Sequence, residues 1–104
     1  MDINLAYRTY VGGTVPSAQK LRAQSHDIPP ATLEAWISEF EKLHRALEGY
    51  LEAGQVSDWK AETQDKVLAF ARESHPWLDA DSGRSLLSFV GWYGWHEGLI
   101  HLGC

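Results

Sequence analysis

Cysteine and positive charge are both scarce in this sequence. The single cysteine is Cys104, so no disulfide bond can form within the chain, and a chain without disulfides is typical of a reducing compartment. Nine lysine and arginine residues stand against 14 aspartate and glutamate residues, which gives a formal net charge of −5 at pH 7. Because phosphate groups are bound by basic surfaces, this balance argues against nucleic acid as a partner. An acidic chain suits a partner protein with a basic surface, or serves solubility alone.

Long apolar runs are missing as well. No segment approaches the roughly 20 apolar residues that cross a bilayer. The first ten residues, MDINLAYRTY, have neither the basic start nor the apolar run of a signal peptide. We therefore expect a cytoplasmic protein without a membrane partner. A chain of 104 residues has the usual length of one domain, so residues 1–104 are expected to form a single helical domain.

Apolar residues recur at helical spacing in several segments bounded by glycine and proline. The clearest segment is 32–53, whose apolar stripe consists of Trp36, Phe40, Leu43, Leu47 and Tyr50, widened by Leu33, Ile37, His44 and Leu51. Helices are also expected over about 3–11, 17–25, 58–74 and 83–102. No segment alternates convincingly like a strand. The sequence therefore predicts an all-α protein, a compact bundle of four or five helices.

Polar residues before these segments are expected to cap the helices. Thr32 is the expected N-cap of the long helix, and Gly54 is its expected stop. Ser57 or Asp58 is expected to cap the helix that follows.

The segment GWYGWHEGLIH, residues 91–101, invites comparison with the zinc motif H-E-x-x-H. Its two histidines, His96 and His101, are separated by one position too many, which places them about 140° apart around a helix. They cannot chelate one ion from a regular helix. The segment DADSGR, residues 79–84, lacks the glycine and glutamate that a calcium loop requires. The sequence therefore predicts no metal site and no cofactor.

The motifs of catalysis are absent too. No serine lies in a G-x-S-x-G elbow, and residues 12–14 have neither the lysine nor the spacing of a phosphate-binding loop. We predict that the protein is not an enzyme and has no catalytic residue. The alternative is a small enzyme whose site is assembled from distant residues, with His75, Asp79, His96 and Glu97 as the candidates.

The glycines of the last helix fall on one narrow stripe. Glycine costs about 1 kcal/mol relative to alanine inside a helix. Three glycines lie on this stripe, Gly91, Gly94 and Gly98. They indicate that another backbone or a large side chain approaches there, with Trp36, Phe40 and Trp59 as candidate side chains. Glu97 falls within an apolar strip of the same helix and, if buried, needs a hydrogen-bond donor or becomes protonated.

Seven residues are candidates for binding a partner. Trp92 and His96 lie one turn apart, and an exposed tryptophan beside a histidine is a plausible hot spot; packing of Trp92 beneath the 75–77 loop is the alternative. The acidic face of the long helix would either meet a basic partner or face solvent, and its candidates are Glu41, Glu48 and Glu52. The last two candidates are Asp79 and Asp81, which would either cap the last helix or meet a basic partner.

The chain resembles bacterial immunity proteins, the antidotes paired with secreted or contact-delivered toxins. The resemblance is one of type, and lies in an acidic helical chain of this length that lacks a catalytic constellation and has an aromatic-rich C-terminal helix ending in WHEGL. It implies a non-catalytic protein that binds a toxin or effector domain and masks its active site in the cytoplasm of the producing cell. The alternative is a structural or regulatory subunit of a larger phage or secretion-system complex.

Overall fold

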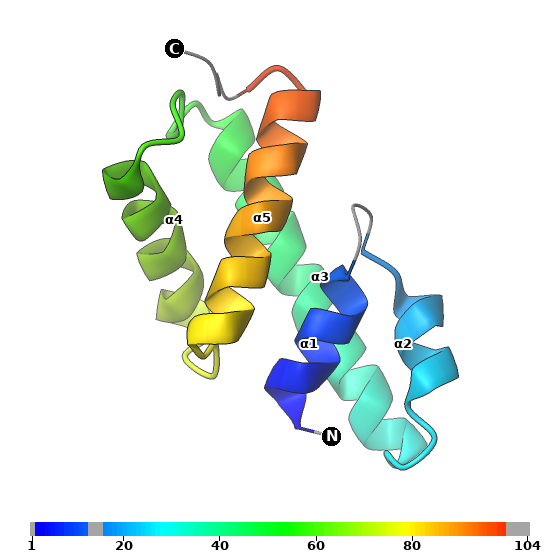
Figure 1. The fold of residues 1–104 in the computed structure, drawn as a ribbon. Coiled ribbons are helices and arrows are strands. Elements are labelled where there is room, and N and C mark those ends of the chain that lie inside the picture. Colours follow the sequence, from blue (N-terminus) through cyan, green and yellow to red (C-terminus); the bar gives the residue numbers. More distant parts are fainter. Residues whose placement is uncertain (1, 13–15, 100–104) are drawn as a thin grey trace.

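Five helices make up most of the chain in the computed structural model, which describes residues 2–12 and 16–99 (Figure 1). They are α1 (Ile3–Val11), α2 (Ala18–Gln24), α3 (Pro30–Glu52), α4 (Ala61–Ser74) and α5 (Ala80–His96). The prediction of an all-α bundle of four or five helices is confirmed. Within the described ranges, none of these helices combines the length and the apolar character needed to cross a membrane.

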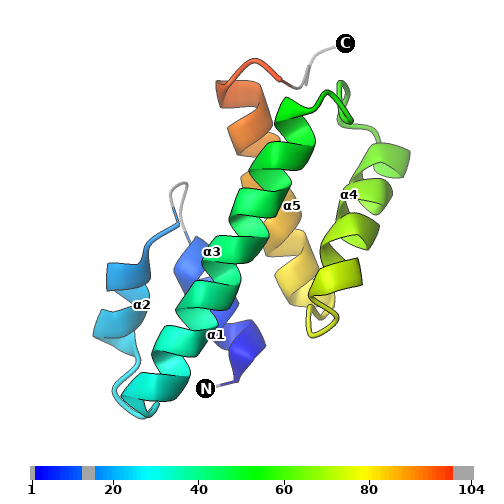
Figure 2. The same cartoon turned by 180° about the vertical axis from the view of Figure 1, so that it is seen from behind.

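The long helix α3 runs along the whole molecule and the other helices pack against its two halves. Its 23 residues give it a length of about 35 Å. Helices α1 and α2 lie beside its N-terminal half, and α4 and α5 lie beside its C-terminal half, in both views (Figures 1 and 2). Helix α5 contacts both α1 and α4 and so joins the two groups. The radius of gyration, 13.8 Å, is close to the value of about 13 Å expected for a compact domain of this length.

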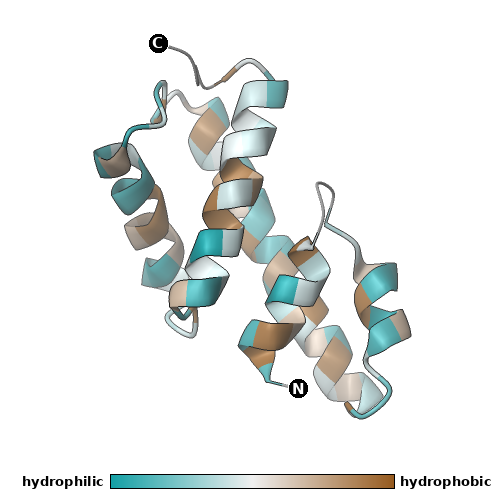
Figure 3. Ribbon diagram, viewed as in Figure 1, coloured by the Kyte–Doolittle hydropathy of each residue, from teal (hydrophilic) through white to brown (hydrophobic). Residues whose placement is uncertain are grey.

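One hydrophobic cluster includes residues from all five helices. Its fully buried members include one from each helix, namely Tyr7, Leu21, Phe40, Val67 and Leu86. Hydrophilic and apolar positions alternate along α3 and α4 (Figure 3), as expected of helices with one buried face. The apolar stripe predicted for α3 is therefore the buried face of that helix, although Trp36 and Tyr50 at its two ends are only partly buried.

Two helices do not begin at the N-cap residues that the sequence predicted. Helix α3 starts at Pro30 with Pro29 as its N-cap, so the prediction of Thr32 as N-cap is wrong. Proline suits the first turn because that turn needs no backbone N–H donor. Helix α4 starts at Ala61 with Lys60 as its N-cap. Asp58 still serves this end from outside the helix, because its carboxylate accepts the Lys60 N–H at 3.0 Å.

Helix α5 keeps its predicted N-terminal cap but is shorter than predicted. The Asp79 carboxylate accepts the Ser82 N–H at 2.8 Å, so of the acidic candidates Asp79 is the N-cap. The helix begins at Ala80, and the predicted start at about residue 83 is wrong. The helix ends at His96 rather than near residue 102, with Glu97 as its C-cap. Gly98 follows with a φ of 73°, the left-handed conformation that commonly terminates helices. The predicted end at residue 102 lies outside the described residues.

The predicted close approach to the glycine stripe occurs at Gly91. The side chain that approaches it is Trp59, because a methyl group added at Gly91 would lie 2.9 Å from the indole Nε1 atom. Of the three candidates, Trp59 is therefore the one found against this glycine. Gly94 is also buried, whereas Gly98 lies beyond the helix.

This packing predicts opposite effects for two glycine substitutions. Gly49, on α3, has open space where a side chain would begin, so Gly49→Ala should raise the free energy of unfolding by about 0.5–1 kcal/mol through its helix propensity. Gly91→Ala should lower it, because Trp59 must shift. Chemical denaturation of both variants measures the difference.

Adding Trp59→Leu to Gly91→Ala should recover part of the loss. If Gly91→Ala stabilises the protein as much as Gly49→Ala, the Trp59 contact does not require glycine.

Candidate functional site

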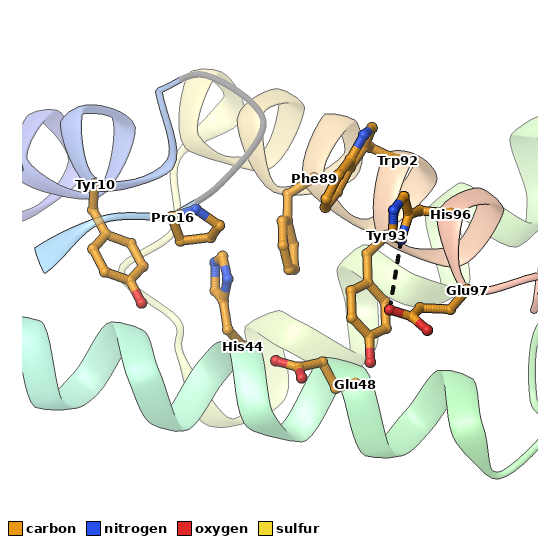
Figure 4. A pocket seen from close by; sticks show the side chains of 9 residues that line it. All are labelled: Tyr10, Pro16, His44, Glu48, Phe89, Trp92, Tyr93, His96 and Glu97. Carbon is orange, nitrogen blue, oxygen red and sulfur yellow. Dashed lines mark ion pairs between the residues drawn. The ribbon is translucent and has the colours of Figure 1, made fainter.

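A pocket of about 320 Å³ opens between α3 and the C-terminal half of α5 (Figure 4). Helix α3 contributes His44 and Glu48, while Tyr10 and Pro16 close the side towards α1 and α2. The α5 side is formed by Phe89, Trp92, Tyr93, His96 and Glu97. The walls are mainly aromatic and the polar groups are few, as is usual for sites that hold one ligand group.

His44 forms the buried part of the pocket wall. It is 4% exposed, and its Nε2 atom is 2.8 Å from the hydroxyl oxygen of Tyr7. Phe89 stacks on the imidazole with 4.2 Å between ring centroids. The other ring nitrogen, Nδ1, is buried and has no hydrogen-bond partner among residues 2–12 and 16–99. Burial lowers the pKa of His44 to about 4, so the ring is neutral at pH 7.

Carboxylates surround the open side of the pocket. Glu52 accepts a hydrogen bond from the Tyr93 hydroxyl at 3.3 Å, and Glu97 lies 3.6 Å from Nδ1 of His96. Burial, together with the nearby charges of Glu48, Glu52 and Glu97, raises the pKa of Tyr93 to about 12. Burial also raises the pKa of Tyr10, with smaller contributions from Glu41 and Glu48. The carboxylates therefore contribute a negative potential at both tyrosines, in addition to the effect of burial.

Trp92 and His96 stack on each other at the rim. Their ring centroids are 5.0 Å apart and the ring planes differ by 24°. Trp92 is half-buried, and the His96 side chain is 58% exposed. Packing of Trp92 beneath the 75–77 loop is not observed; Trp77 instead contacts Tyr7 and Phe40.

Five of the seven predicted partner-binding residues gather in this region. Trp92, His96 and Glu48 line the pocket. Glu52 adjoins it through its hydrogen bond from Tyr93, and Glu41 is close enough to Tyr10 to raise its pKa.

The other two candidates lie at the opposite end of α5, about 25 Å away along the helix. Asp79 caps α5 and lies 3.5 Å from Nη1 of Arg8. Asp81 forms an ion pair with Arg84. Internal contacts therefore engage both carboxylates, and the structure does not bring them to the pocket.

The four residues considered for an enzyme do not converge. His96 and Glu97 are neighbours at the pocket rim, and Glu97 is exposed rather than buried in an apolar strip. His75 is buried elsewhere, with its Nδ1 atom 2.7 Å from Oε1 of Glu39. Among the described residues no three histidine, cysteine, aspartate or glutamate side chains could hold a metal ion; His101 and Cys104 lie outside them.

The sequence missed the inner wall of the pocket. His44 lies on the apolar stripe predicted for α3, and helical spacing gave no sign that His44, Phe89 and Tyr10 together line a pocket. The available signal was the histidine itself, because a polar ring within an apolar stripe must find a hydrogen-bond partner or leave a polar atom unsatisfied.

No family model matches the chain, and neither a curated protein nor a solved structure matches it. The fold and the site therefore define its class only as a five-helix protein with an aromatic, acid-rimmed pocket.

The buried imidazole predicts a specific pH dependence of stability. Its pKa is about 4 when folded and 6.5 in the unfolded chain, so the unfolded state binds an extra proton between these values. The free energy of unfolding is therefore unaffected by His44 protonation above pH 6.5. It decreases as the pH falls towards 4, by up to about 3 kcal/mol. Urea denaturation across this range measures it.

A double variant, Tyr7→Phe with His44→Phe, removes both partners of the buried hydrogen bond and should lose this component. The double variant should still lose stability at lower pH. Hydrogen bonds lower the pKa values of Glu34 and Asp79 in the folded protein, so their contribution to stability is lost when these carboxylates are protonated. Identical pH profiles for the two proteins above pH 4.5 would show that His44 protonation is not coupled to folding.

Proposed function

We propose that this protein is a non-catalytic binding protein that recognises and neutralises a partner protein, as an immunity protein neutralises its toxin. The contact surface is the pocket face, defined as the pocket together with Glu41 and Glu52. The observation that carries the proposal is that a half-buried tryptophan, Trp92, lines the same pocket as the carboxylates of Glu48 and Glu97.

The aromatic part of the pocket face suits a binding hot spot. Tryptophan and tyrosine contribute large contact areas with few rotatable bonds, and they are enriched where binding energy concentrates. Trp92 is braced by its stacking on His96, so little side-chain entropy is lost when a partner covers it. Trp95, which is 58% exposed, extends the aromatic surface on the same helix.

The charge of the pocket face favours a partner with a basic surface. Glu41 and Glu48 form no ion pair with a cation in the part of the chain that the structure describes, whereas Glu34 on the same helix is paired with Arg22 at 2.7 Å. Unpaired carboxylates steer a basic partner and raise the association rate. The first candidate partner is the product of a neighbouring gene, since antidotes and toxins act in pairs.

Two substitutions on the pocket face should weaken binding without unfolding the protein. Trp92→Ala should weaken the complex by about 2 kcal/mol or more, the loss typical of a hot spot. Glu48→Lys should slow association, and this effect should diminish at high salt. Binding kinetics with the purified neighbouring gene product measure both effects, and circular dichroism checks the fold.

Glu73→Lys is the matched control, because Glu73 is an exposed glutamate on α4 and does not line the pocket. It should leave binding unchanged. Cells that express the partner should survive with the wild-type protein and Glu73→Lys, and grow poorly with Trp92→Ala. If cells that express the partner survive without any form of this protein, the partner does not need to be neutralised. The alternative role, a subunit of a larger complex, would then remain.

A further inference from the structure

The unsatisfied nitrogen of His44 indicates what the pocket receives. Burial raises the pKa of Tyr7, so this residue keeps its hydroxyl proton. When Tyr7 donates that proton to Nε2, the His44 hydrogen lies on Nδ1 and only this N–H lacks a partner. In the opposite tautomer Nε2–H would donate to the Tyr7 oxygen, which would leave both the Tyr7 hydroxyl proton and the bare Nδ1 without partners. Because unsatisfied buried donors are costly, the first tautomer is favoured.

The pocket therefore holds a donor and an acceptor side by side. Glu48 follows His44 by four residues, so the two side chains project from the same face of α3. Both point from α3 towards the space below Phe89 (Figure 4). Nδ1 is covered from solvent, so a group that enters there meets the Glu48 carboxylate directly and reaches the His44 N–H once the covering side chains shift slightly.

Few chemical groups satisfy both polar positions. Guanidinium and ammonium groups have no acceptor for the His44 N–H, and a carboxylate would be repelled by Glu48 and Glu97. A hydroxyl group both accepts and donates, as does a carboxamide. The remaining walls are the rings of Tyr10, Phe89 and Trp92, which pack best against another aromatic ring.

We propose that the pocket receives the phenol group of a tyrosine side chain of the partner, with the hydroxyl accepting from His44 Nδ1 and donating to the Glu48 carboxylate. This proposal rests on the proposed function and names the anchor of that interface. The volume of about 320 Å³ is at the small end for ligand pockets, which suits one side chain. Glu52 and Glu97 beside the opening favour a positively charged residue next to that tyrosine.

Three small molecules test the chemistry on the unaltered protein. Tyramine carries the phenol and a positive charge, phenethylamine lacks only the hydroxyl, and 4-hydroxyphenylpropionate carries a negative charge instead. Tyramine should bind about tenfold more tightly than phenethylamine, because phenethylamine lacks the hydroxyl and so cannot form the hydrogen bonds to His44 and Glu48. The anionic phenol should bind more weakly than tyramine. Titration followed by NMR gives the dissociation constants and locates the shifts.

The His44 ring provides a second readout that does not depend on a variant folding. Nitrogen-15 NMR of the wild-type protein should show a protonated Nδ1, and tyramine should shift this resonance but phenethylamine should not. Glu48→Gln should reduce the preference for tyramine, with Glu73→Gln as the matched control. Equal affinities for tyramine and phenethylamine, or a protonated Nε2 with bare Nδ1, would overturn the proposal.

The outcomes separate this proposal from the proposed function. A partner that depends on Trp92, combined with no preference for tyramine, overturns the tyrosine anchor alone. A clear preference for tyramine, combined with a partner complex indifferent to Trp92 and Glu48, supports the phenol chemistry but assigns the pocket to a free small molecule. That result overturns the pocket face as the contact surface of the proposed function. Both positive results, together with loss of binding when a partner tyrosine is changed to phenylalanine, support both.

Discussion

The hydrogen bond between Tyr7 and His44 is the constraint that ties helices α1, α3 and α5 together in the core. It joins α1 to α3 at 2.8 Å, and Phe89 of α5 stacks on the same imidazole. Within an apolar cluster, either polar group alone would be left unsatisfied if the helices slid by one residue. One polar pair thus specifies the relative positions of three helices that apolar contacts alone would hold less selectively.

The core and the candidate site share the same side chains. Tyr10 and Phe89 belong to the hydrophobic cluster, yet they also line the pocket. Their positions are held by neighbours such as Phe40, whose ring centroid lies 5.4 Å from that of Tyr10. A pocket whose walls are core residues is already in its binding geometry, so less conformational entropy is lost on binding than at a site made of loops.

Sequence periodicity predicted the parts of this structure that depend on one helix at a time. The buried stripe of α3 through Phe40 followed from spacing alone, and Trp59 was among the side chains expected to approach the glycine stripe. The start of α3 was missed because that helix begins at Pro30 without a side-chain cap. The start of α4 was missed because the capping oxygen of Asp58 acts from outside its helix. The pocket was missed because His44 becomes significant only when α1 and α5 meet it, and spacing within α3 carries no information about that meeting.

The unsatisfied groups of the structure are not spread evenly. Two buried side-chain nitrogens in the described ranges lack a hydrogen bond, but one of them, Nη1 of Arg8, lies 3.5 Å from Asp79 and is compensated by that charge. The other, Nδ1 of His44, has no such compensation. It lies in the pocket that Glu48 and Trp92 also line. A buried donor, a carboxylate without a cation and an accessible aromatic surface each lack something that a bound group supplies. Their convergence on one pocket is difficult to attribute to fold stability, which would be better served by an apolar residue in place of His44.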